Sequence, residues 1–249
     1  MTDSSVALFN GCSFVWGDEL KDPMNTRFSK LFSEQLGMIE VNLSLRGGSN
    51  ERIYRTTLDY LQNNPNPETV VIVWSGIDRF EYIDVMEKDQ HDEYYLQCSP
   101  SRINQAEYRK LKPHLIGYML RILDDYKRSI DTINKMCSIQ FICDTMDIPL
   151  LQYQFTNRHR DIMNVLLGKN PFNEREESLQ KYYKSKVDYL KPYSSLGLKD
   201  FNDLLGLSID IGDVRLVRGY YGHPLEKSQV MFADMMINEF RNKHDCWLQ

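Results

Sequence analysis

Three apolar segments of strand length, each closed by a turn that contains glycine, restrict the fold of this chain most. The first begins at Val6 and runs into Gly11-Cys12-Ser13, the second spans 38–45, and the third spans 69–74. The third is apolar and β-branched on both faces, which is typical of a central parallel strand. Because a helical pattern follows each strand, the three units predict an α/β fold with a parallel sheet and right-handed crossovers. The loops after these strands are then expected at one shared edge of the sheet.

Further elements follow from the spacing of apolar residues. Helices are expected at 28–36, at 53–61 with Ser49 or Asn50 as the cap, at 115–137, 158–167, 174–190, 198–205 and 232–240, and a fourth strand at 150–155. The charged segment 84–104 lacks such spacing and is expected to be irregular, either walling a substrate pocket or forming a solvated surface loop. No repeat, low-complexity tract or linker divides the sequence, so residues 1–249 are expected to form a single domain.

Charge and cysteine content argue against several classes of function. The formal net charge is −5 without a long basic block, so a nucleic-acid partner is not expected. Five cysteines, an odd number without a Cys-x-x-Cys pair, support neither a disulfide framework nor a zinc site and suit a reducing compartment. With no basic leader and no apolar run of about 18 residues, the expected location is the cytoplasm, without a signal peptide or a membrane span. The oligomeric state stays open.

Two residues stand out as candidates for chemistry. Ser13 follows the first strand, at the end of a parallel sheet where ligands bind, although serine is equally common as a turn or cap residue. Val15 occupies the second glycine position of Gly-x-Ser-x-Gly, so the segment is not that nucleophile elbow. His223 lies in a Gly-His-Pro turn before the last amphipathic helix, a place where histidine is often structural. A strand-end serine together with this histidine favours nucleophilic catalysis.

Four short segments resemble, in order and spacing, the four sequence blocks of the SGNH/GDSL hydrolases. These are Gly11-Cys12-Ser13, Asn42 with Gly47 five residues later, Gly76-Ile77-Asp78, and His223-Pro224. The sequence from Gly11 to Leu20 especially resembles SGNH-type proteins of tailed bacteriophages and marine bacteria. For a phage-encoded protein, the expected location would be the host cytoplasm or the virion. The resemblance extends over nearly the whole chain.

This resemblance implies a three-layer α/β/α sandwich with a central, mostly parallel sheet, of the SGNH or flavodoxin-like kind. It also implies hydrolysis of an ester, such as an acetyl or acyl group on a carbohydrate or similar small substrate. Ser13 would be the nucleophile and His223 the general base. The backbone N–H groups of Ser13 and Gly47 would form the oxyanion hole. No metal or other cofactor is implied.

Two positions depart from the pattern of these hydrolases. Asp78 stands where an asparagine would donate to the oxyanion, and a carboxyl group donates only when it is protonated. Tyr220 stands three residues before His223, where an aspartate would orient the ring. A backbone carbonyl would then have to orient the ring in a Ser-His dyad, or Asp210 or Asp213 would have to reach it.

The departures leave an alternative function open. The chain would then be a catalytically weak or inactive SGNH-like binding or assembly module, such as a phage particle component, with tyrosine and tryptophan faces for sugar or protein contacts. A nucleotide-binding Rossmann protein is less well supported, because Arg46-Gly47-Gly48-Ser49-Asn50 is not the required Gly-x-Gly-x-x-Gly.

Overall fold

The computed structural model of the chain describes residues 5–77, 79–83, 95–98, 125–154, 177–178, 181 and 223–247. The helices expected at 158–167 and 198–205, most of the one at 174–190, and the first part of the one at 115–137 lie outside the described residues. So do the site candidates Asp78 and Tyr220, and the neighbouring Asp210 and Asp213.

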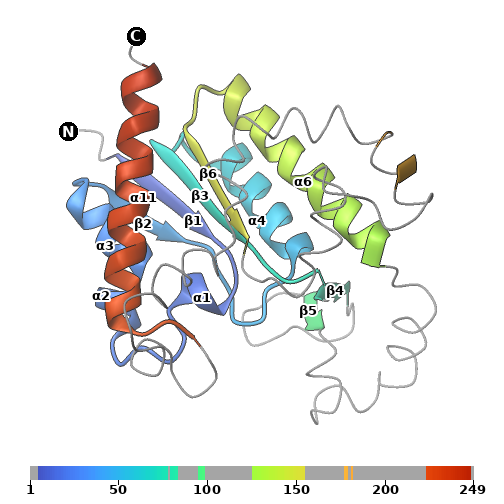
Figure 1. Ribbon diagram of the computed structural model, residues 1–249, viewed down its shortest axis with the longest axis horizontal. Coiled ribbons are helices and arrows are strands. Elements are labelled where there is room, and N and C mark those ends of the chain that lie inside the picture. Colours follow the sequence, from blue (N-terminus) through green and yellow to red (C-terminus); the bar gives the residue numbers. More distant parts are fainter. Residues whose placement is uncertain are drawn as a thin grey trace.

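Four parallel strands form the central sheet in the order β2-β1-β3-β6 (Figure 1). They are β1 (Val6–Asn10), β2 (Ile39–Asn42), β3 (Thr69–Trp74) and β6 (Leu150–Gln154). Phe9 of β1 lies opposite Asn42 of β2 on one side and Val71 of β3 on the other. The chain therefore turns from one side of β1 to the other after β2, which makes the carboxyl end of β1 a topological switch point, where α/β proteins bind ligands.

Helices cover both faces of the sheet, as Figure 1 shows. Helices α3 (Phe28–Gln35) and α11 (Glu226–Trp247) pack on one face, and α4 (Asn50–Asn63) and α6 (Asp125–Thr145) on the other. Neighbouring residues of a strand point to opposite faces, so β1, β3 and β6 each contribute to two cores. The first core contains Ala7, Phe9, Val71, Val73, Phe28, Phe32, Phe232 and Met236, and the second contains Leu8, Val70, Ile72, Trp74, Ile53, Ile133 and Met136. The expected three-layer α/β/α sandwich is confirmed.

Most expected elements in the described part of the chain are present, with shifted ends. The strand expected at 38–45 ends at Asn42, yet Leu43 and Leu45 still donate backbone hydrogen bonds to the carbonyl oxygens of Phe9 and Gly11 at 2.8 and 3.3 Å. Ser49 caps α4 by accepting from the Arg52 backbone N–H at 3.3 Å. None of the described helices is long and apolar enough to cross a lipid bilayer.

The prediction that the whole segment 84–104 is irregular is wrong for its middle part. Strand β5 (Tyr95–Cys98) pairs antiparallel with β4 (Phe80–Ile83) in a small second sheet. Glu81 of this sheet forms two hydrogen bonds with Arg55 of α4, at 2.8 and 3.3 Å. Gln97 donates to Glu81 at 2.8 Å and accepts from the Ser49 backbone N–H at 3.0 Å. These contacts fix the second sheet to the first half of α4.

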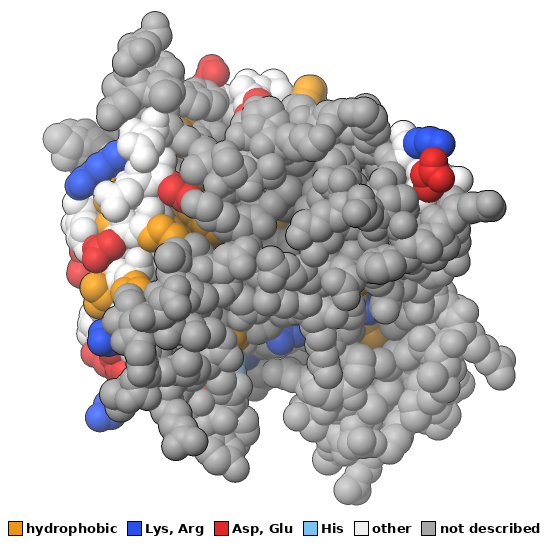
Figure 2. Space-filling model, viewed as in Figure 1, with side chains coloured by type: hydrophobic (Ala, Val, Ile, Leu, Met, Phe, Trp, Pro, Cys, Tyr) orange, Lys and Arg blue, Asp and Glu red, His pale blue; other side chains and the backbone are white. Residues whose placement is uncertain are grey.

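The described side chains at the edge formed by α2 (Pro23–Thr26), α3 and α11 are of mixed type. In Figure 2, basic, acidic and hydrophobic side chains alternate at the left of the molecule, over these helices. Lys30 and Glu34 of α3 form an exposed ion pair there at 3.2 Å. Within the part of the chain that the structure describes, this edge carries no extended basic surface.

Cys143 of α6 provides a test of the second core. Burial and, to a smaller extent, the neighbouring Asp144 carboxylate raise the pKa of its thiol to about 12. Because the thiolate is the reactive form, we expect iodoacetamide at about pH 8 to leave Cys143 unmodified in the native protein. Half-buried Cys137 on the same helix should react first, and denaturant should make both react equally, as measured by peptide mass spectrometry.

The same burial has a consequence for stability. The unfolded chain releases this proton near the ordinary pKa of 9.0, whereas the folded chain holds it up to about pH 12. The contribution of Cys143 to stability is therefore complete below pH 9 and is lost as the pH rises toward 12. Rapid alkylation of Cys143 in the native protein would contradict this packing.

Candidate active site

The carboxyl end of β1 is anchored before it reaches Ser13. Asn10 is fully buried, and its amide donates to the Ile53 carbonyl oxygen at 3.0 Å and to the Thr56 and Thr57 hydroxyls at 2.8 and 2.9 Å, all on α4. Its side-chain oxygen accepts the Gly11 backbone N–H at 2.8 Å. Each hydrogen-bonding group of this buried amide is thus occupied, so the strand end is held in one position relative to α4.

Ser13 begins a four-residue helix, α1 (Ser13–Trp16), which the sequence analysis did not predict because one turn is too short to show periodicity. Gly11 lets this helix turn tightly against the sheet. A Cβ at Gly11 would lie 2.3 Å from a methyl carbon of Val15 and 3.0 Å from the Val73 carbonyl oxygen, both closer than atoms can approach without movement. The side chain of Ser13 is buried but lies at the sheet edge that carries the loops.

The structure brings the two predicted catalytic residues together from opposite ends of the chain. His223 Nε2 lies 2.9 Å from Ser13 Oγ, within hydrogen-bonding distance, although the residues are 210 positions apart. The ring of Phe14 packs against the imidazole with centroids 5.1 Å apart. Gln229 of α11 holds the neighbouring segment, because it donates to the Pro224 carbonyl oxygen at 3.0 Å and accepts the Phe28 backbone N–H at 2.8 Å.

A third residue at the site, Glu19, was not found by the sequence analysis. Its Oε2 atom lies 2.7 Å from His223 Nδ1 and 3.1 Å from the His223 backbone nitrogen. Position 220, where the sequence analysis sought this acid, lies outside the described residues. The only signal in the sequence was the pair of acids, Asp18 and Glu19, directly after Gly17.

Asp18 lies on the other side of the imidazole. Its Oδ2 atom is 3.9 Å from His223 Nε2, and its Oδ1 atom forms an ion pair with Arg46 at 2.9 Å. Arg46 precedes Gly47 in the loop after β2, so this ion pair connects the loop to the turn after α1. The side chain of Arg46 is 57% exposed, which makes the pair a weak contributor to stability.

The loop that carries Gly47 packs against the turn before Ser13. Leu45 donates to the Gly11 carbonyl oxygen at 3.3 Å, and a Cβ at Gly48 would lie 3.2 Å from that same oxygen. Gly47 has a φ of +76°, a conformation that glycine adopts without strain. Among the described residues, the backbone N–H groups of Ser13 and Gly47 have no hydrogen-bond acceptor. Both donors are therefore available at this edge, and Asp78, the third predicted member, lies outside the described residues.

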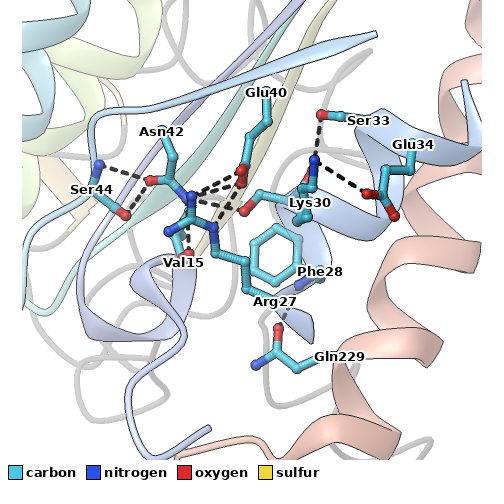
Figure 3. Close-up of polar contacts among 11 residues, drawn as sticks. Val15, Arg27, Phe28, Lys30, Ser33, Glu34, Glu40, Asn42, Ser44 and Gln229 are labelled. Atoms are coloured by element: carbon cyan, nitrogen blue, oxygen red, sulfur yellow. Dashed lines mark hydrogen bonds and ion pairs between the residues drawn. The ribbon is translucent and has the colours of Figure 1, made fainter. Parts of the chain in front are cut away.

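A polar network that includes Asn42 contacts α1 at Val15, as Figure 3 shows. Asn42, the last residue of β2, donates to the Val15 carbonyl oxygen at 3.1 Å and to the Ser29 hydroxyl at 3.0 Å. Beside it, the Arg27 guanidinium and the Glu40 carboxylate form two parallel hydrogen bonds of 2.8 Å. Both side chains of this ion pair are more than nine-tenths buried. The network joins β2 and α3 to the helix that carries Ser13.

The described residues include no group of three or more His, Cys, Asp or Glu side chains arranged to hold a metal ion. The 2.9 Å contact of Ser13 Oγ and His223 Nε2 permits proton transfer between a hydroxyl and an imidazole.

Comparison with known proteins identifies this fold. No family model matches the chain, and no curated protein sequence matches it either. The chain is similar in structure to the psychrotrophic esterase EstA from Pseudoalteromonas sp., with a TM-score of 0.50, 14% identity, and coverage of 97% of this chain and 100% of the other. It is equally similar to a putative lipolytic protein of the G-D-S-L family from Desulfitobacterium hafniense, with a TM-score of 0.50, 10% identity, and coverage of 94% and 99%. The chain therefore has the fold of these proteins.

Replacing Arg27 with Met tests the polar network that contacts α1. The substitution leaves the buried Glu40 carboxylate without its ionic partner, so we expect the free energy of unfolding to fall by about 3–5 kcal/mol in urea denaturation. Replacing Lys30, whose ion pair with Glu34 is exposed, should cost less than about 1 kcal/mol. If both substitutions lowered the free energy of unfolding equally, the buried Arg27–Glu40 pair would contribute no more to stability than the exposed Lys30–Glu34 pair.

Proposed function

We propose that this protein is a serine ester hydrolase in which Ser13 is the nucleophile and His223 the general base. The observation that carries the proposal is the 2.9 Å separation of Ser13 Oγ and His223 Nε2 at the carboxyl end of β1. This distance is within the range needed for direct proton transfer between a nucleophile and its base. The switch-point position adds support, since substrates of α/β enzymes bind outside this edge of the sheet.

In the acylation step, Ser13 Oγ attacks the ester carbonyl carbon while its proton moves to His223 Nε2. The carbonyl electron pair moves to oxygen, which gives a tetrahedral oxyanion. When this intermediate collapses, the bond between the carbonyl carbon and the alcohol oxygen breaks. The proton on Nε2 moves to that oxygen, and the acyl group stays on Ser13.

In the deacylation step, a water molecule attacks the acyl carbon and gives its proton to His223 Nε2. Collapse of the second intermediate releases the carboxylic acid, and Nε2 returns the proton to Ser13 Oγ. On the side of the protein, acylation uses only Ser13 and His223, and deacylation uses the same two residues and one water molecule.

The oxyanion would be held by the backbone N–H groups of Ser13 and Gly47. Their lack of an acceptor among the described residues, and the packing of the Gly47 loop on Gly11, support this assignment. In a serine protease, removal of one side-chain donor from the oxyanion hole lowers the rate by about 10²–10³. Asp78 is assigned a donor role only in its protonated form, so two donors are the expected minimum.

The substrate proposed is a small ester, such as an acetyl or acyl group on a carbohydrate. The resemblance of the four blocks to SGNH/GDSL hydrolases supports this class. The structural neighbour from Pseudoalteromonas sp. is described as an esterase inhibited by monoethylphosphonate. A phosphonate whose phosphorus is attacked by a nucleophilic serine, with loss of its leaving group, is therefore a suitable probe for Ser13.

A fluorophosphonate probe with peptide mapping tests the proposal. We expect labelling at Ser13, and its loss in Ser13→Ala and His223→Ala, because the first lacks the nucleophile and the second lacks the base. Release of acetate from acetylated sugars should fall by about 10⁶-fold in Ser13→Ala, as for the nucleophile of another serine hydrolase. Ser138→Ala is the matched control, since Ser138 lies on α6 and its hydroxyl donates only within that helix.

The contrary result would be a folded protein that neither labels at Ser13 nor releases acid from any ester. It would favour the binding or assembly module over the hydrolase.

A further inference from the structure

Both imidazole nitrogens of His223 have a polar contact. The contact at Nδ1, opposite Ser13, comes from Glu19 in the segment after α1. Glu19 Oε2 lies 2.7 Å from Nδ1, while Nε2 lies 2.9 Å from Ser13 Oγ. The same carboxylate oxygen accepts the His223 backbone N–H at 3.1 Å. The side chains of His223 and Glu19 are only 14% and 15% exposed, so solvent competes little for these contacts.

Backbone hydrogen bonds define the turn between Ser13 and Glu19. The Ser13 carbonyl oxygen accepts the backbone N–H groups of Gly17 at 3.1 Å and Asp18 at 3.0 Å, and Leu20 donates to the Gly17 carbonyl oxygen at 3.3 Å. Gly17 ends α1 in the left-handed region with a φ of +85°. Glu19 adopts a φ of +66°, which is uncommon for a residue with a linear side chain. Such a conformation persists where the surrounding contacts fix it, and it often marks a functional position.

The chemistry of a carboxylate decides which imidazole nitrogen carries the proton. An ionised carboxylate only accepts hydrogen bonds, so His223 Nδ1 must be the donor to Glu19. The neutral ring then has its lone pair on Nε2, directed at Ser13 Oγ. During proton transfer the ring becomes a cation, which the adjacent carboxylate stabilises. Asp18 does not serve this purpose, because it lies 3.9 Å from Nε2 and is paired with Arg46.

We infer that Glu19 is the positioning residue for His223. The carboxylate that orients the imidazole then comes from the same turn as the nucleophile, Ser13. The inference rests on the proposed function in its catalytic part, whereas the assigned ring tautomer stands independently of it. It also accounts for Tyr220 at the position where SGNH/GDSL hydrolases have an aspartate, since a carboxylate three residues before the histidine is not needed in this arrangement.

Two substitutions at position 19 separate orientation from charge. Glu19→Met is similar in size and linear shape but accepts no hydrogen bond, so the Nδ1–H tautomer should no longer dominate. Glu19→Gln can accept both hydrogen bonds at the same oxygen but lacks the charge. Glu34→Gln is the matched control, since the Glu34 side chain is 56% exposed on α3 and its carboxylate forms an ion pair with Lys30 at 3.2 Å.

The first measurement is ¹⁵N NMR of the His223 ring at a pH where the ring is neutral. We expect the Nδ1–H tautomer in the wild type, in Glu19→Gln and in Glu34→Gln, and its loss as the main form in Glu19→Met. This readout needs no substrate. If Ser13 fails to label while this pattern holds, the hydrolase proposal fails and the assignment of Glu19 as the residue that orients the ring survives.

The second measurement is the change of kcat against KM. We expect kcat to fall by about 10⁴-fold in Glu19→Met, the loss that a serine protease shows when its imidazole is left in the wrong tautomer, with KM nearly unchanged. Glu19→Gln should retain the thermal stability of the wild type and have an intermediate kcat. A merely structural role predicts that Glu19→Gln has wild-type kcat.

The inference is overturned if Ser13 labels normally while Glu19→Met keeps both the Nδ1–H tautomer and wild-type kcat. Should Glu19→Met fail to fold, Glu19→Gln decides the question through its kcat, because its hydrogen bonds preserve the fold.

Discussion

Parallel pairing of β1 with both β2 and β3 is the constraint on which the rest of this structure depends. Parallel neighbours cannot be joined by a hairpin, so each connection crosses a face of the sheet and brings a helix with it. The first connection places α3 on one face, and the next places α4 on the other. As a result, the carboxyl end of β1 lies between the connection to β2 and the connection from β2 to β3, which cross opposite faces of the sheet. Ser13 occupies this position, where a side chain can be reached by loops from several strands and by the segment before α11.

The site rests on polar interactions that are buried or half-buried. Asn10 holds the strand end to α4, Asn42 holds α1, and the Arg27–Glu40 pair lies beside Asn42. Buried polar groups are costly unless their hydrogen bonds are complete, and these groups find several partners each. A satisfied polar network fixes one geometry more strictly than apolar packing does. The position of Ser13 relative to His223 therefore depends on residues that touch neither of them.

The sequence was informative where a structural element has a pattern long enough to read. The boundaries of β3 were predicted correctly, because an uninterrupted apolar, β-branched run can be buried on both faces. The four-residue helices α1 and α2 were missed, since one turn shows no period, and β5 was missed because its pairing with β4 is not encoded in its own composition. Ser13 and His223 could be proposed from strand ends and block order. Glu19 could not, because its approach to His223 depends on a left-handed backbone conformation and on a contact 204 residues away.

The separation of Ser13 and His223 along the chain has a consequence for biosynthesis. A ribosome adds about 5–20 residues per second, so the 210 residues between the hydroxyl and the imidazole take about 10–40 s to translate. Throughout that interval the nascent polypeptide contains Ser13 and Glu19 but not yet the His223 imidazole. The contact between the hydroxyl and the ring therefore forms only after the last part of the chain has been synthesised and has folded onto the sheet.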